Sequence, residues 1–71
     1  MYDQPMPQMV LIRMLDSPMY IYEVHGAIFV TWVFNSKRAA LFPQAKVVEW
    51  IRCLETMTGK LLMFELTERT Q

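Results

Sequence analysis

The longest run of apolar residues spans positions 18–34, PMYIYEVHGAIFVTWVF, and few polar side chains interrupt it. Strand-forming residues dominate both halves, and His25-Gly26 separates them with a dipeptide suited to a tight turn. Glycine reaches positive φ without steric cost, and histidine tolerates positive φ better than most residues. The pattern therefore predicts a hairpin of two strands, over residues 19–24 and 27–34.

A first strand is predicted over residues 9–15, MVLIRML, because its side chains alternate in polarity. The tripeptide DSP at residues 16–18 combines two turn-forming side chains with proline, which ends this strand. Residues 1–8 contain two prolines that cannot donate the hydrogen bonds of a sheet, so they are expected to be a flexible lead-in. One ordered domain is therefore predicted over residues 9–68, with a short tail at residues 69–71.

Apolar side chains recur at helical spacing within residues 43–58, which predicts a helix there. The apolar stripe consists of Val47, Trp50, Ile51, Leu54 and Met57. Pro43 suits the first turn of a helix, and Gly59 suits its left-handed end. The segment KLLMFELTE at residues 60–68 predicts the last strand. The order is βββαβ, and the predicted class is α+β: one helix packed on one face of a mainly antiparallel four-stranded sheet.

The hairpin distributes its side chains over two faces, because side chains alternate along a strand. If Val24 pairs with Ala27, then Ile21 and Trp32 lie on the face that packs against the helix. Leu62, Phe64 and Leu66 of the last strand are expected to join them. The opposite face then exposes an apolar patch that consists of Tyr20, Tyr22, Phe29, Val33, Leu11, Leu15 and Met63.

An exposed apolar patch larger than a few hundred Å² usually marks an interface. This face could be covered by a second copy of the chain, by a foreign protein or by the N-terminal segment. Alternatively, a shifted hairpin register would remove the patch. We expect self-association through the aromatic face. The protein-interface residues are predicted to be Tyr20, Tyr22, Phe29, Val33, Leu11 and Met63.

The size and composition of the chain limit how it can be stabilised. A domain of 71 residues buries only about 60% of the surface of its unfolded chain. The only cysteine, Cys53, cannot form an intrachain disulfide, and Cys53 with His25 falls short of the four ligands of a zinc site. No metal and no cofactor is therefore predicted. With 54% hydrophobic residues, the composition favours tight packing or a partner.

No catalytic arrangement is evident in the sequence. The sole histidine, His25, is predicted in an exposed turn, away from any nucleophile and orienting acid. Gly26 and Gly59 are the only glycines, so there is no glycine-rich phosphate loop. The protein is expected not to be an enzyme and to have no catalytic residues. The alternative is a thiol enzyme that uses Cys53, whose pKa a neighbouring Arg52 could lower if both were exposed.

The charges disfavour binding to nucleic acid. Seven basic and seven acidic side chains give a net charge of zero, with no basic cluster to attract a phosphate backbone. Lys37 and Arg38, in the loop before the helix, are the best basic pair, and Arg13 lies on a strand. With the tyrosines of the sheet face they could imitate a stacking platform for single strands. A nucleic-acid-binding protein using Lys37 and Arg38 is therefore the alternative function.

The chain is expected to be soluble and cytoplasmic, because it lacks a visible secretory signal and any apolar run of the roughly 20 residues that span a membrane. The leading hypothesis is a non-enzymatic protein-binding module, homodimeric, that blocks or adapts a larger protein. Phage-type inhibitors of host machinery, such as anti-CRISPR proteins, are often single domains of this kind. That comparison is an analogy of size and style, and no residue carries it.

Overall fold

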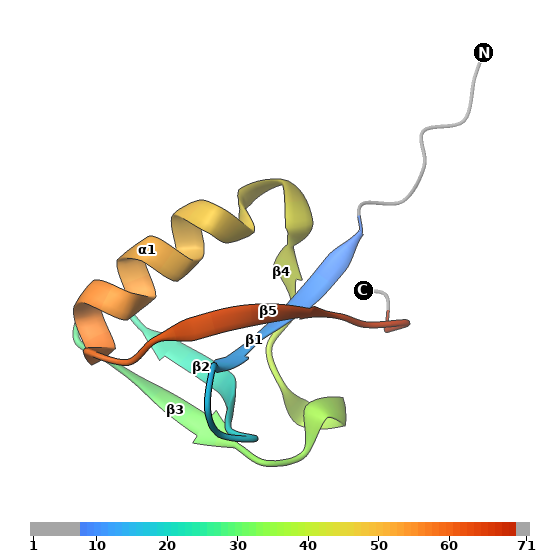
Figure 1. Ribbon diagram of the computed structural model, residues 1–71, viewed down its shortest axis with the longest axis horizontal. Coiled ribbons are helices and arrows are strands. Elements are labelled where there is room, and N and C mark those ends of the chain that lie inside the picture. Colours follow the sequence, from blue (N-terminus) through green and yellow to red (C-terminus); the bar gives the residue numbers. More distant parts are fainter. Residues whose placement is uncertain (1–7, 70–71) are drawn as a thin grey trace.

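The computed structural model of the protein describes residues 8–69, so residues 1–7 of the expected lead-in and residues 70–71 of the expected tail lie outside the described chain. The elements, in order, are β1 (Met9–Met14), β2 (Tyr20–His25), β3 (Phe29–Val33), the 3-10 turn η1 (Ser36–Arg38), β4 (Phe42–Pro43), the 3-10 turn η2 (Gln44–Lys46), helix α1 (Val47–Thr58) and β5 (Leu62–Leu66). All strand pairs are antiparallel (Figure 1). The α+β class predicted from the sequence is confirmed.

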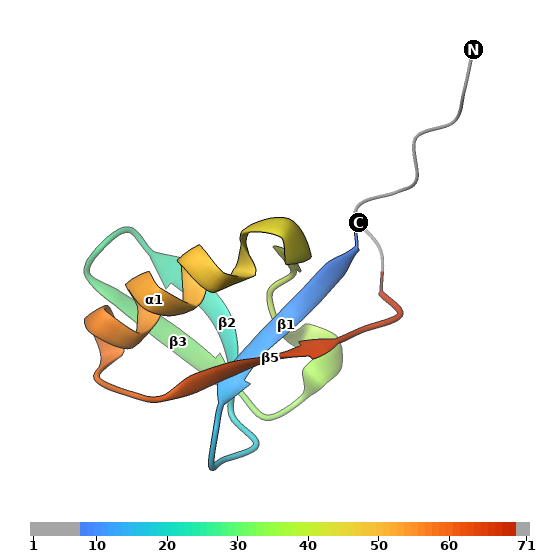
Figure 2. The same ribbon diagram turned by 45° about the horizontal axis from the view of Figure 1, so that its top comes forward.

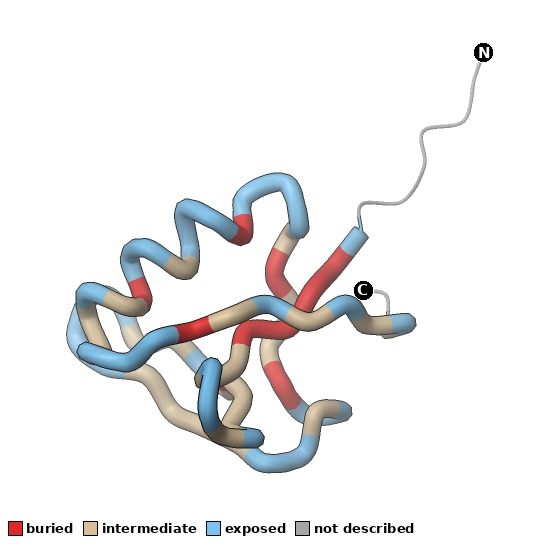
Figure 3. Tube along the Cα trace, viewed as in Figure 1, coloured by how far each residue is buried: buried red, intermediate tan, exposed pale blue. Residues whose placement is uncertain are grey.

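Strand β1 is the centre of the sheet. It pairs with β5 along one edge in a regular ladder from Val10↔Leu66 to Met14↔Leu62. Its other edge is shared by β4, which pairs with Met9 and Val10, and by β2, which pairs through Arg13. The order is β3-β2-β1-β4, with β5 at the opposite edge of β1. The first four residues of β1 are buried on both faces of the sheet (Figure 3).

Short β4 adds a fifth strand to the four that were predicted. Two residues are too few to show a periodic pattern, and Pro43, expected in the first helical turn, pairs with Met9 instead. Proline lacks an N–H, so it is tolerated at the margin of a sheet. The helix was expected to begin at residue 43, but α1 begins four residues later, at Val47, because η2 comes first. Its predicted end is confirmed: Gly59 has φ +70° and donates its N–H to Glu55 O.

Helix α1 covers one face of the sheet, as predicted (Figure 2). Val47 and Leu54 are almost fully buried against a core cluster that also contains Val10, Ile12, Ile21, Phe42 and Leu62. The expectation that Trp50 is a core residue is wrong: 37% of Trp50 is exposed, and its ring meets Phe42 edge to face. Trp50 lies at one margin of the stripe, so its flank faces solvent.

Strand β5 also buries less than expected. Leu62 is in the core, but 37% of Phe64 and 63% of Leu66 are exposed. Their cross-strand neighbours Ile12 and Val10 belong to the core cluster and are fully buried. The end of β5 lies at the margin of the sheet, where nothing in the described chain covers Leu66.

The register predicted for the hairpin is wrong. His25 is the last residue of β2 and pairs with Phe29, so three residues, Gly26 to Ile28, form the turn. Gly26 has φ +61°, which agrees with its predicted role as the residue that permits the turn. A bulge at Tyr22 then shifts the pairing by one residue. With both changes Ile21 faces Trp32, so these two side chains still share the core face.

Candidate protein-binding surface

The second face of the sheet, expected to be an open apolar patch, is partly covered by the chain itself. Leu11 is only 2% exposed, so its expected place in an interface is wrong. The segment after β3 crosses this face, and Ala40 donates its N–H to Ile21 O at 2.9 Å. Nη1 of Arg69 holds the same segment by donating to Ser36 O at 2.8 Å and to Ala39 O at 2.9 Å. Arg69, expected in a tail, therefore fastens this cover.

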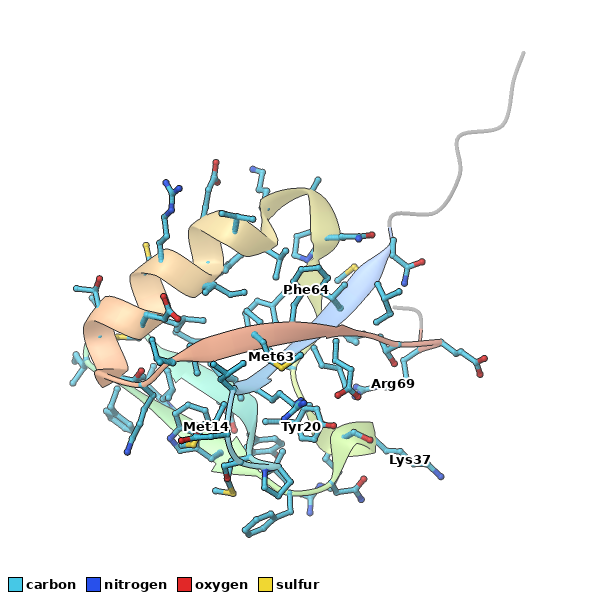
Figure 4. All side chains as sticks on the ribbon, viewed as in Figure 1. Met14, Tyr20, Lys37, Met63, Phe64 and Arg69 are labelled. Carbon is cyan, nitrogen blue, oxygen red and sulfur yellow. The ribbon has the colours of Figure 1, made fainter. Side chains whose placement is uncertain are left out.

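A polar cluster occupies the neighbouring part of the same face (Figure 4). The Tyr20 hydroxyl donates to the Glu65 carboxylate at 3.1 Å from Oε1, and Arg13 Nε lies 3.2 Å from Glu65 Oε2. Met63, the cross-strand partner of Arg13, is half-buried beside this cluster. Burial raises the pKa of the Tyr20 phenol above 10.0; the hydrogen bond to Glu65 and its charge raise it further, whereas Arg13 lowers it.

This pKa shift predicts how stability depends on pH. The folded chain holds the Tyr20 proton more tightly than the unfolded chain, so the contribution is fully present below pH 10.0 and is lost as the pH rises above it. We expect Glu65→Gln to lower the Tyr20 pKa, because it removes the negative charge beside the phenol. Tyrosinate absorbance during an alkaline titration measures this, with Tyr20→Phe to assign the component. An unchanged titration in Glu65→Gln would contradict the assigned contact.

The remaining residues of the expected interface do not form one exposed patch. Tyr22 is half-buried, with the Arg38 guanidinium 5.6 Å from its ring centre. Half of Phe29 is exposed, and its ring stacks on His25 at a centroid distance of 4.4 Å. Val33 pairs with Tyr20 and is half-buried. Their role in binding a partner stays a prediction, and the sheet face offers much less apolar surface than expected.

The predicted basic pair separates in the structure. Lys37 is exposed in η1 and points away from the rest of the molecule, whereas Arg38 lies over Tyr22 (Figure 4). The small hollow beside Lys37 is also lined by Glu65 and Glu68. These two carboxylates offset the positive charges of Lys37 and of Arg69, which lines the same hollow, and so reduce the local attraction for a phosphate.

A broad hollow lies on the other side, between the hairpin turn and the second half of α1. It is a shallow groove of about 760 Å³. The turn contributes Gly26, Ala27 and Ile28, and the helix contributes Arg52, Cys53, Thr56 and Met57. Ile28 is 80% exposed because the three-residue turn projects it beyond the end of the sheet. We call this site the turn–helix groove.

A second hollow, of about 220 Å³, continues along α1 from the turn–helix groove. Lys46, Glu49 and Trp50 line it, and Cys53 lines both hollows. Trp50, Cys53 and Met57 therefore form one flank of the helix along the two hollows, and Met57 also packs against the core. Successive members of this set are three and four positions apart, so they lie on one side of the helix.

The chemistry of the groove suits contact with an apolar group. Its polar side chains are the Thr56 hydroxyl and the Arg52 guanidinium, and neither hollow contains a histidine. Within residues 8–69 Arg52 forms no ion pair, because the only carboxylate–cation contact there joins Arg13 to Glu65. Arg52 can therefore pair with a carboxylate from outside the chain.

Other kinds of site are not formed by the described residues. No group of three or more histidine, cysteine, aspartate or glutamate side chains in residues 8–69 could hold a metal ion. Cys53 is exposed, but no base lies in the turn–helix groove to activate it. His25, expected in an exposed turn, is half-buried at the end of β2. No helix of the described chain is long and apolar enough to span a membrane.

The fold and the site define a small α+β domain with an apolar groove beside its single helix. No protein-family model matches the chain, and neither a curated protein nor a solved structure matches it. Function therefore has to be inferred from the surface itself.

Sequence reasoning did not find the turn–helix groove. Its components are a turn residue, Ile28, and a helix flank, Cys53 and Met57, which are far apart in sequence. The available signal for an exposed apolar site was Ile28, two residues after Gly26, because a turn normally carries polar residues. The predicted register placed Ile28 inside a strand opposite Glu23, which hid that signal.

Proposed function

We propose that the protein is a non-enzymatic protein-binding module that docks a segment of a larger protein in the turn–helix groove. The observation that carries this proposal is the exposure of Ile28 beside the apolar flank of α1. A side chain that is 80% exposed contributes little to folding, whereas burying it in a contact contributes about 1.5–3 kcal/mol.

The chemistry of the groove points to one kind of partner. An apolar side chain of the partner would contact Ile28 and Met57, and a carboxylate next to it would pair with Arg52. The groove has no acidic lining that would repel this carboxylate. Charge complementarity at the rim adds to specificity and association rate more than to affinity. Binding of this kind blocks or adapts the partner without chemistry.

The single cysteine of the chain supplies the test. Cys53 lies in the groove, so a bulky maleimide attached there fills the site without disturbing any buried residue. Peptides selected from a displayed random library on the unmodified protein should be enriched in sequences with an apolar residue next to Asp or Glu. These peptides should lose at least about tenfold in affinity, or about 1.4 kcal/mol, on the maleimide-modified protein.

The controls separate blocking from damage. Cys53→Ser should keep the affinity for the selected peptides. A Cys53→Ser, Lys37→Cys variant carries the maleimide on the distant loop, and it should bind as tightly as the unmodified protein. Selection of no peptide above background, or equal binding to both modified proteins, would contradict the proposal.

A nucleic-acid-binding function is the less supported alternative. Arg38 is engaged by Tyr22, and acidic side chains accompany Lys37. Titration of a labelled single-stranded oligonucleotide at low and high salt tests it. Salt-dependent binding that Lys37→Glu abolishes would move the functional site to η1.

A further inference from the structure

The outer edge of β5 is open within the described chain. Within the described chain β5 pairs only with β1, so one edge of this strand has no neighbouring strand. Such an edge presents unpaired N–H and C=O groups that can pair with another strand. Natural sheets usually protect edge strands with proline, lysine or a bulge, and β5, LMFEL, has none of these.

The ladder with β1 decides which backbone groups face outward. Leu15 donates its N–H to Leu61 O, so residue 61 is bonded toward β1. Bonded and non-bonded pairs alternate along an antiparallel ladder, so Met63 and Glu65 are also bonded toward β1. The backbone groups of Leu62, Phe64 and Leu66 therefore point away from the sheet.

Only one of these outward groups has a partner within residues 8–69. The Leu62 N–H donates to Glu55 Oε2 of the helix at 2.9 Å. The outward groups of Phe64 and Leu66 have no such bond, and both side chains are substantially exposed. The edge therefore offers backbone donors and acceptors beside exposed apolar side chains.

The other edges of the sheet are less suited to pairing: β4 has only two residues, and β3 is irregular. The bulge at Tyr22 interrupts its ladder with β2, and bulges increase local twist. Only Phe29 of β3 is exposed, whereas the β1–β5 ladder is regular over its whole length.

We propose that two copies of this chain associate through the outer edge of β5, antiparallel, to form one continuous sheet across the dimer. Centred on Phe64, this pairing brings Phe64 opposite Phe64 of the second copy and Leu66 opposite Leu62. The Leu62 N–H is already bonded to Glu55, and the two strands still exchange bonds at Phe64 and from each Leu66 N–H to the facing Leu62 O. Aromatic side chains directly opposite each other stabilise antiparallel pairs.

The charges disfavour one of the neighbouring registers. A shift of one residue in each strand would centre the pair on Glu65 and place two glutamates directly opposite each other. Like charges in that position are destabilising. With Phe64 at the centre, Met63 instead faces Glu65 of the second copy, and each Glu65 keeps its Arg13. The edge is therefore self-complementary, which a two-fold interface requires.

Sedimentation equilibrium over micromolar to millimolar concentrations tests the dimer. Wild type should approach 16.8 kDa, which is twice the 8.4 kDa chain mass. Leu66→Pro removes an N–H that points outward and leaves the ladder with β1 intact, so this variant should stay at 8.4 kDa. Leu61→Lys is the matched control, because Leu61 is equally exposed but precedes β5, and it should still dimerise.

Amide hydrogen exchange of the wild type provides a test that needs no substitution. Exchange at Phe64 and Leu66 should slow as concentration rises, whereas exchange at Met63 and Glu65, bonded to β1, should change much less. A wild type that stays monomeric, or a folded Leu66→Pro that dimerises fully, would overturn the proposal. Because the turn–helix groove is a separate surface, monomeric Leu66→Pro should still bind the selected peptides.

Discussion

Leu11→Asp will remove a large share of the folding stability of the domain, although the sequence placed this residue on an exposed interface. Leu11 is 2% exposed, so the substitution removes a packed side chain and buries a carboxyl group without a partner. The two effects together cost about 3–8 kcal/mol. The total stability of a domain of this size is about 4–11 kcal/mol. Far-ultraviolet circular dichroism with urea titration measures the loss.

Phe29→Asp is the matched control for this prediction. Phe29 was assigned to the same interface, but half of its surface is exposed and its main contact is the stack on His25. The substitution should lower the free energy of unfolding by about 1 kcal/mol or less. Similar stability of the two variants would mean that the segment after β3 does not cover Leu11.

Leu54→Ala will lower the free energy of unfolding by about 2–5 kcal/mol, the cost of a cavity in a packed core. Leu54 is 1% exposed and lies between α1 and the sheet, in the same cluster as Ile12 and Ile21. Within residues 8–69 α1 is the only α-helix on this face of the sheet, so little chain is available there to close the gap. Urea unfolding followed by circular dichroism gives the value.

Val48→Ala is the control on the same helix. Val48 is 58% exposed, so shortening it removes few contacts, and alanine has the higher helix propensity. The free energy of unfolding should change by less than about 0.5 kcal/mol. A Leu54→Ala variant as stable as Val48→Ala would contradict the placement of the apolar stripe.

Local signals in the sequence predicted the elements well where a residue type has one structural use. Gly59 and Gly26 both adopt the positive φ expected of them, and they end the helix and begin the hairpin turn. The apolar stripe predicted the side of α1 that packs on the sheet, since Val47 and Leu54 are its most buried members. These features depend on neighbours in sequence.

Features that depend on distant residues were not predictable in the same way. The bulge at Tyr22 and the three-residue turn change the hairpin register, and no local pattern specifies either. Strand β4 has only two residues and exists because it pairs with Met9 and Val10. The margin of the stripe, where Trp50 lies, depends on how far the sheet extends beneath the helix.

The exposure of the expected interface was overestimated for a related reason. A sheet face looks open in the sequence when the segment that covers it has no regular structure of its own. Residues between β3 and β4 cross this face, and Arg69 fastens them through backbone carbonyls, which carry no sequence signal. The apolar surface that remains for a partner lies instead at the turn–helix groove and along the edge of β5.

The most direct measurement is a nuclear magnetic resonance titration of the isotope-labelled protein with the tightest selected peptide. The account predicts that the largest chemical-shift changes occur at Ile28, Thr56 and Met57 and saturate at one peptide per chain. Reversing the rim charge with Arg52→Glu should weaken binding of peptides that carry a carboxylate. Shift changes concentrated at Lys37 and Arg38, with the groove unaffected, would contradict the account.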